Sequence, residues 1–156
     1  MIVMRFKRKK GNKFGAIKTT IDGIRFDSKI ESKHYIQLRD SDLVFEMQVT
    51  YTLQPSFKHE GKLIRAIQMR PDFVVKTPYE TYVLDSKGQL TPEFKLKAKL
   101  LLHSHGVEII PVTSMRAMDL VIDRIREANT PREIAQELDD IQKAMRAEKK
   151  LKKLNK

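Results

Sequence analysis

The sequence contains no cysteine, and this absence excludes disulfide bonds and zinc sites built on thiolates. It also lacks any apolar run close to the roughly 20 residues that a membrane-spanning helix needs. The first segment, MIVMRFKRKKGNK, has only a few apolar residues before a basic cluster, which is not the pattern of a secretory signal. Together these absences fit a protein of a reducing cytosol.

Acidic residues are few compared with basic ones. Lysine and arginine number 31 against 20 aspartates and glutamates, which gives a formal net charge of +11. An excess of this size points to a polyanionic partner, most simply nucleic acid. A membrane surface is a weaker candidate, because the basic residues are spread along the chain without a strongly apolar helix face. A solvated basic surface is the remaining interpretation.

The chain is long enough for one domain with a hydrophobic core, since 40% of its 156 residues are hydrophobic. We expect residues 1–20 to form a flexible basic arm, residues 21–112 the folded core and residues 113–156 a helical extension. Contacts between such an arm and phosphates would depend strongly on salt.

Periodic patterns predict the order helix, three strands, helix, strand and two further helices. The predicted elements are a small turn at Asp22–Gly23, a helix at 28–39, strands at 43–54 and 63–76, a third strand after a turn at 77–80, a helix at 92–103, a strand at 107–112, and helices that begin after Thr113 or Ser114 and at Thr130. The first three strands are most simply an antiparallel meander, and the fourth follows a crossover helix and can join in parallel. This order predicts an α/β fold with a mixed central sheet.

The last helix carries an apolar stripe formed by Ile134, Leu138, Ile141 and Met145. A stripe at this spacing is typical of packing on the domain or on a partner helix. The lysine-rich end of the same helix is expected to fray.

Two acids and a lysine are predicted to converge around the turn at 77–80. If Pro78 and Tyr79 form a two-residue loop, Asp72 lies opposite Asp85 with Cβ atoms roughly 4.5–5.5 Å apart, whereas a slipped register gives a diagonal pair about 7–8 Å apart. Lys87 lies two residues beyond Asp85 and so points to the same face. Two carboxylates this close repel unless a cation lies between them or they share a proton. A cross-strand salt-bridge cluster is the alternative interpretation.

Further polar residues are candidates for the same cleft. Glu31 either completes a capping box with Ser28 or faces the acids from the first helix. Glu46 and Gln48 share the polar face of their strand and are expected beside Asp72. Pro71 marks a bulge or an edge. His34 is expected at the surface, where it could contact phosphate.

These residues resemble a known family. Pro71-Asp72 followed by Asp85-Ser86-Lys87 matches the PD-(D/E)XK nuclease signature, and the predicted element order matches the α-β-β-β-α-β core of that superfamily. The segments FDSKIESKHYIQL, YTLQPSF, IRAIQMRPDFVV, LDSKG and FKLKAKLL resemble small phage-encoded nucleases related to Holliday-junction resolvases. The resemblance covers roughly residues 11–110. It implies a restriction-endonuclease-like α/β core with a mixed central sheet, followed here by C-terminal helices.

The resemblance also implies roles for individual residues. Asp72 and Asp85 would be metal-binding carboxylates, and the backbone carbonyl of Ser86 a further ligand. Glu31 would complete the site, and Lys87 would orient the attacking water. Oxygen ligands favour Mg²⁺ or Mn²⁺ over zinc. Ser86 replaces an apolar residue that is common in the signature, and its side chain is expected to point away with little effect.

The expected function is that of a metal-dependent, structure-selective endonuclease on branched DNA, of the phage Holliday-junction resolvase type, acting in the bacterial host cytoplasm. A near two-fold symmetric junction needs two active sites, so a homodimer is expected. The alternatives are a nicking or flap and replication-fork nuclease, and a basic DNA-binding protein without catalysis. The predicted DNA contacts are Lys9, Lys10, Lys13, Lys29, Lys33, Arg70, Lys95, Lys97 and Lys99.

Overall fold

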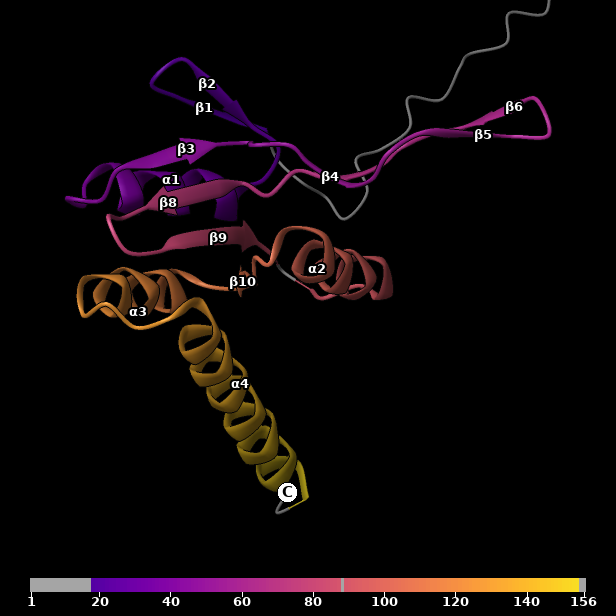
Figure 1. The fold of residues 1–156 in the computed structure, drawn as a ribbon. Helices are drawn as coiled ribbons and strands as arrows, with labels where there is room; N and C mark the ends of the chain where they lie inside the picture. The colour runs from indigo at the N-terminus through magenta and orange to yellow at the C-terminus, as the bar shows by residue number, and fades with distance from the viewer. Residues whose placement is uncertain (1–17, 88, 155–156) are drawn as a thin grey trace, which may run out of the picture.

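The computed structural model describes residues 18–87 and 89–154 (Figure 1). Most of the predicted basic arm at 1–20, including Lys9, Lys10 and Lys13, therefore lies outside the described residues. The described chain is a mixed α/β fold with a mixed central sheet and C-terminal helices, as the sequence predicts. None of its described helices combines the length and the apolar character needed to cross a membrane.

The chain enters through a hairpin and then the first helix. Strands β1 (Thr19–Ile21) and β2 (Ile24–Phe26) are joined at Asp22 and Gly23, whose φ angles of 52° and 78° are those of a type I′ turn. The predicted turn is confirmed, and the two short strands beside it are additional. Helix α1 (Lys29–Arg39) follows, with Ser28 as its N-cap.

The central sheet has the strand order β10-β9-β8-β3. Strands β3 (Phe45–Met47), β8 (Phe73–Lys76) and β9 (Thr81–Ser86) are antiparallel, while β10 (Ile109–Val112) runs parallel to β9. Helix α2 (Pro92–His105) provides the crossover between β9 and β10. It begins at the predicted cap Thr91 and ends at Gly106, which has a φ of 64°.

The register between β8 and β9 is the one predicted. Thr77 donates its backbone N–H to the Glu80 carbonyl at 3.0 Å, which closes the tight turn. Phe73 pairs with Leu84, so the next facing pair outward is Asp72 and Asp85. The hairpin therefore brings the two acids together at the end of the sheet.

The two long strands predicted at 43–54 and 63–76 are each broken. Gln48 has a φ of 52° and separates β3 from β4 (Tyr51–Gln54), and Pro71 lies between β7 (Ile67–Met69) and β8. The breaks face each other, since the Gln48 N–H donates to the Asp72 carbonyl at 3.0 Å. Beyond them β4 pairs with β7, and β5 (Phe57–His59) pairs with β6 (Lys62–Ile64). The prediction of two continuous strands was wrong. Pro71 has no backbone N–H to donate and Gln48 has a left-handed backbone, and both interrupt the hydrogen bonds between the strands.

Both faces of the sheet are covered. Alternate residues of β8, β9 and β10 point to a core shared with α1, α3 (Met115–Arg126) and the start of α4 (Pro131–Leu154), or to a second core shared with α2, β4 and β7. Leu84 belongs to the first core and Val83 to the second. By this alternation Asp85 points to the α2 face of the sheet, and Ser86 points to the α1 face.

Helix α4 packs on the body only over its first part and then projects from it (Figure 1). Ile134 and Leu138 are buried, whereas Ile141 and Met145 are 41% and 53% exposed. The apolar stripe therefore covers the domain with one half and faces solvent with the other. The lysine-rich end expected to fray is helical as far as Leu154.

Candidate functional site

Asp72, Asp85 and Lys87 converge at the end of β8 and β9. Asp72 accepts a hydrogen bond of 2.7 Å at Oδ2 from the Ser86 backbone N–H. Asp85 is 3% exposed, and Lys87 Nζ lies 2.9 Å from its Oδ2. This is an ion pair by distance only, since among the described residues Asp85 Oδ2 has no aligned hydrogen-bond donor. The acid–acid–lysine arrangement predicted from the sequence is therefore present.

Glu31 lies in the first turn of α1 and is 6% exposed. Its backbone N–H donates to Ser28 Oγ at 3.2 Å, which confirms Ser28 as the helix cap. Its side chain borders the same cavity as Asp72 and Lys87. Burial raises its pKa, and the nearby Asp85 carboxylate raises it further, against a hydrogen bond from the Asp27 backbone. Glu31 therefore takes part in the cap of α1 through its backbone and lines the site with its side chain.

The site brings together three carboxyl groups, of which Glu31 and Asp85 are buried and Asp72 is half-buried. Burial and then repulsion by Asp85 raise the pKa of Asp72 to about 7. Burial also raises the pKa of Asp85, although the Lys87 ammonium opposes this effect. Glu31 is the third carboxyl group here, and Lys87 and Arg70 are the basic side chains that line the same cavity. A divalent cation placed among the carboxyl groups would offset both the repulsion and the missing hydration.

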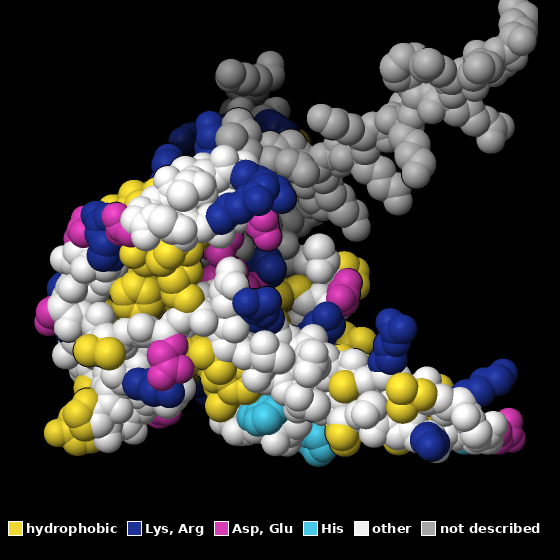
Figure 2. All heavy atoms as spheres, turned by 90° about the horizontal axis from the view of Figure 1, so that it is seen from above, with side chains coloured by type: hydrophobic (Ala, Val, Ile, Leu, Met, Phe, Trp, Pro, Cys, Tyr) yellow, Lys and Arg dark blue, Asp and Glu magenta, His cyan; other side chains and the backbone are white. Residues whose placement is uncertain are grey.

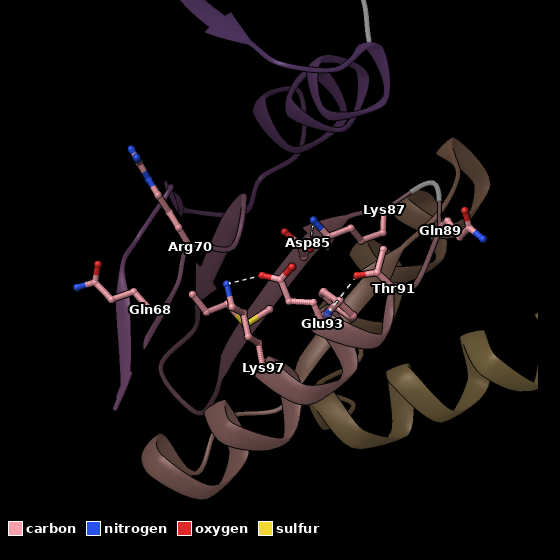
Figure 3. Close-up of a pocket in the computed structure, with 10 residues that line it drawn as sticks. Gln68, Arg70, Asp85, Lys87, Gln89, Thr91, Glu93 and Lys97 are labelled. Atoms are coloured by element: carbon pink, nitrogen blue, oxygen red, sulfur yellow. Dashed lines mark hydrogen bonds and ion pairs between the residues drawn. The ribbon is translucent and has the colours of Figure 1, made fainter. Parts of the chain in front are cut away.

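Two cavities lie beside the acids, and Arg70 and Lys87 line both of them. The cavity toward α1 has a volume of about 400 Å³ and is lined by Asp27, Ser28, Glu31, Gln48, Arg70, Asp72, Ser86 and Lys87. The cavity toward α2 has a volume of about 760 Å³ and is lined by Gln68, Met69, Arg70, Asp85, Lys87, Gln89, Thr91, Glu93, Phe94 and Lys97 (Figure 3). Lysine and arginine side chains lie close to acidic ones on this face of the molecule (Figure 2).

The polar face of the broken strand at 43–54 is only partly in the site. Gln48 lines the α1-side cavity, and its side chain accepts a hydrogen bond of 2.6 Å from Arg70. Glu46, predicted beside Asp72, is exposed and pairs instead with Lys76 at 2.7 Å. The placement of Glu46 was wrong because it lies opposite Val74, two residues further into the sheet than Asp72.

The predicted DNA contacts fall into two groups within the described residues. Arg70 and Lys97 line cavities, and Lys97 pairs with Glu93 at 3.0 Å. The others are exposed but line neither of the two cavities: Lys29, Lys33, Lys95 and Lys99. Thr91 and Glu93 were not among the predicted site residues. The sequence signal that could have placed Thr91 and Glu93 in the site is the predicted helix start at Thr91, because it follows Lys87 closely in the chain.

His34 is fully buried, so its expected place at the surface was wrong. Its Nδ1 shares a hydrogen bond of 2.8 Å with Ser86 Oγ, and burial lowers its pKa. The Ser86 side chain points to the face of the sheet opposite to Asp85. Its hydroxyl has the buried His34 ring as a partner, in contrast to the weak contact that was expected. The spacing of Glu31, His34 and Leu38 places all three on one helix face, which is the signal that could have found this contact.

The oxygen-rich site fits a hard divalent cation. Among residues 18–87 and 89–154, no three acidic or histidine side chains form a ready metal cluster. Mg²⁺ commonly takes one or two carboxylates and completes its shell with water and phosphate oxygens. The buried Asp85 oxygen without an aligned donor and the facing Asp72 meet that requirement. The fit is to a cation held by two acids, with water and phosphate oxygens as its other ligands, rather than to a closed protein cage.

A family model described as "Protein of unknown function (DUF1064)" matches residues 11–120. The chain belongs to the DUF1064 family. The part that matches this family includes both cavities and the acid pair, whereas α4 lies beyond it. No curated protein and no solved structure matches the chain.

The Ser86 hydroxyl is predicted to stabilise the fold through His34. Ser86→Ala leaves a buried imidazole nitrogen without a partner, which should cost about 1–3 kcal/mol. The midpoint of thermal unfolding should fall by roughly 2–4 °C for each kcal/mol. Ser104→Ala is the matched control, since this hydroxyl is exposed and bonds within its own helix at 2.7 Å. Equal midpoints for Ser86→Ala and the control would contradict the prediction.

The raised pKa of Asp72 predicts that stability depends on pH. The folded protein holds this proton up to about pH 7 and the unfolded chain only to the ordinary value of 3.8, so stability falls as pH rises between them. Asp72→Asn keeps the acceptor for Ser86 but removes the charge. In EDTA its unfolding midpoint should match wild type at about pH 3.5, where Asp72 is protonated in both the folded and the unfolded chain, and exceed it at about pH 8. A gain that is equal at both pH values, or as large in the exposed control Asp119→Asn, would contradict this explanation.

Proposed function

We propose that this protein is a metal-dependent endonuclease that hydrolyses phosphodiester bonds in branched DNA. The observation that carries the proposal is the convergence of Asp72, Asp85 and Lys87 beside two cavities at one end of a basic protein's sheet. The proposed fold is the restriction-endonuclease-like core. The order α1, β3, β8, β9, α2, β10, with three antiparallel strands and a fourth in parallel, supports it.

Asp72, Asp85 and the Ser86 carbonyl would hold Mg²⁺ or Mn²⁺, which supplies stabilisation of the negative charge that develops on the phosphate. Lys87 has an ammonium group at the cavity wall, where it can orient a water and donate to a phosphate oxygen. Glu31 can accept a hydrogen bond from that water across the smaller cavity. Arg70 is fixed by hydrogen bonds of 3.1 and 2.6 Å to the Gln48 carbonyl and side chain, and so presents a positioned cation to the backbone of the substrate.

Buried acids favour catalysis over simple binding. A protein that only binds DNA gains nothing from carboxylates beside its cations, because each one repels phosphate. Here the acids remain in place although burial raises the pKa of Glu31, Asp72 and Asp85. The non-catalytic DNA-binding protein is therefore the weaker candidate. A nicking or flap nuclease would use the same site and differs only in the DNA shape that it selects.

A cleavage assay on a four-way junction, a flap, a nicked duplex and an intact duplex tests the proposal. We expect cutting with Mg²⁺ or Mn²⁺, none in EDTA, and the highest rate on the junction. Flap cutting at a higher rate would support the nuclease but replace the junction as its substrate. Binding without cutting of all four DNAs would leave the basic binding protein as the explanation.

Asp85→Asn should lower the cleavage rate by roughly 10³-fold or more, since several kcal/mol of charge stabilisation are removed. DNA binding should be unchanged or tighter, because a charge that repels phosphate is absent. Glu46→Gln is the control, since this acid lies in the same sheet but is paired with Lys76. Retained cutting by Asp85→Asn would refute the assignment of the site.

A homodimer that uses α4 is the second part of the proposal. The exposed apolar residues continue along the projecting half of the helix at Ile141, Met145, Leu151 and Leu154. Acidic residues dominate its first half: Glu133, Glu137, Asp139 and Asp140. Basic residues dominate its second half: Lys143, Arg146, Lys149, Lys150, Lys152 and Lys153. Two copies of α4 side by side in antiparallel orientation would match opposite charges and cover the stripe.

Light scattering after gel filtration tests this pairing. Wild type should have twice the chain mass of 18.2 kDa, and the double variant Met145→Glu with Leu151→Glu should be monomeric. Lys33→Glu, at an exposed position on α1 and outside the proposed interface, changes the net charge by the same amount and is the control. A wild type that stays monomeric with DNA present would contradict the dimer and leave the chemistry of a single site unaffected.

A further inference from the structure

The hairpin of β5 and β6 extends away from the body of the protein (Figure 1). The segment from Phe57 to Arg65, which contains both strands and the residue that follows them, is called the β-arm below. All residues of both strands are exposed. The turn at its tip, Glu60 and Gly61, has φ angles of 47° and 76°, as in a tight type I′ turn. The β-arm is thus a defined two-stranded ribbon that contributes nothing to either core.

Apolar side chains on the β-arm are left in solvent. Phe57, Leu63 and Ile64 are 47%, 63% and 40% exposed. A two-stranded ribbon is only marginally stable in water by itself, and these side chains do not support it by packing on the domain. Exposed apolar groups of this size on a projecting element indicate a binding surface.

The charge of the β-arm points to the kind of partner. Lys58, Lys62 and Arg65 form no ion pair with any residue that the structure describes, and Glu60 is the one acid on the hairpin. The cross-strand pairs are Phe57 with Ile64, Lys58 with Leu63 and His59 with Lys62, so each face mixes apolar and basic groups. Yellow and dark-blue side chains both lie along the projection in Figure 2. Lysine is depleted in protein–protein interfaces, whereas this mixture suits the sugars, bases and phosphates of a nucleic acid.

The β-arm starts at the rim of the site. It continues β4 and β7, and β7 leads to Arg70, which lines both cavities. From Arg70 to Ile64 the chain covers about 20 Å at the rise of an extended strand. A ribbon of two strands is narrow enough to enter the major groove of a duplex.

We propose that the β-arm lies in a groove of the DNA duplex that flanks the cleaved phosphate. Lys58, Lys62 and Arg65 contact phosphates on the walls of the groove. Phe57, Leu63 and Ile64 contact sugars and base edges. This inference rests on the proposed function in that the bound DNA is the substrate of the site, and it adds the element that holds the duplex outside the cavities.

The test is a triple variant, Lys58→Ala, Lys62→Ala and Arg65→Ala, in the full-length protein. Its affinity for a labelled four-way junction, measured by fluorescence anisotropy with EDTA present, should fall roughly tenfold or more at moderate salt. The slope of log affinity against log salt should decrease by roughly 0.9 for each phosphate that the variant no longer neutralises. The control triple variant Arg25→Ala, Arg116→Ala and Arg132→Ala removes the same charge from exposed positions outside the β-arm.

A second variant, Leu63→Ser, tests the apolar contacts. It should weaken binding while leaving the salt slope unchanged, because all three basic side chains still neutralise their phosphates. Both variants should unfold at the wild-type temperature, since the replaced side chains are exposed. Unchanged affinity and slope in the β-arm triple variant, or an equal decrease in the control, would overturn the inference.

The outcomes separate this inference from the proposed function. If wild type binds DNA but does not cut it, while the β-arm variants bind more weakly, the proposed nuclease activity is refuted and the proposed DNA contact of the β-arm is supported. If wild type cuts and the β-arm variants bind and cut like it, the β-arm inference alone fails. If the β-arm variants change the oligomeric state and not DNA affinity, the β-arm is a protein contact and the inference is overturned.

Discussion

The repulsion between two facing carboxylates at one end of the sheet is the constraint on which the rest of the site depends. Asp72 and Asp85 are brought together by the register of the β8–β9 hairpin, and the fold buries Asp85 and half-buries Asp72. The pKa of Asp72 rises to about 7 as a result. The Ser86 N–H and the Lys87 ammonium compensate only part of this charge. We propose that a bound divalent cation compensates the rest, which would link the stability of this corner to its proposed chemistry.

Ser86 connects the site to the core. Its backbone N–H holds Asp72, while its side chain reaches the opposite face of the sheet and bonds to His34 of α1. The same helix places Glu31 at the edge of the cavity. One residue of β9 thereby ties the position of an acid to the docking of α1. The strand breaks at Gln48 and Pro71 position Arg70. Gln48 accepts hydrogen bonds from Arg70 and so holds it where it lines both cavities.

The sequence was most informative where local geometry decides the outcome. The proline turn at 77–80 determines the register, and the register determines that Asp72 meets Asp85. Caps at Ser28 and Thr91 place the helices for the same local reason. Alternation failed at Gln48, because a positive φ is not encoded by hydrophobic pattern, and Glu46 was misplaced as a consequence. His34 was misplaced because burial of a polar residue depends on a partner distant in the sequence.

Direct measurement of divalent-cation binding tests the central claim without any assumption about the DNA. Calorimetric titration of the protein with Mn²⁺ at about pH 8, where Asp72 is ionised, should show saturable binding. The binding should disappear when Asp72 or Asp85 is replaced by Asn, and it should be kept in Glu46→Gln. Absence of binding by wild type, or equal binding by the Asp85→Asn protein, would contradict the account of the acid pair as a cation site.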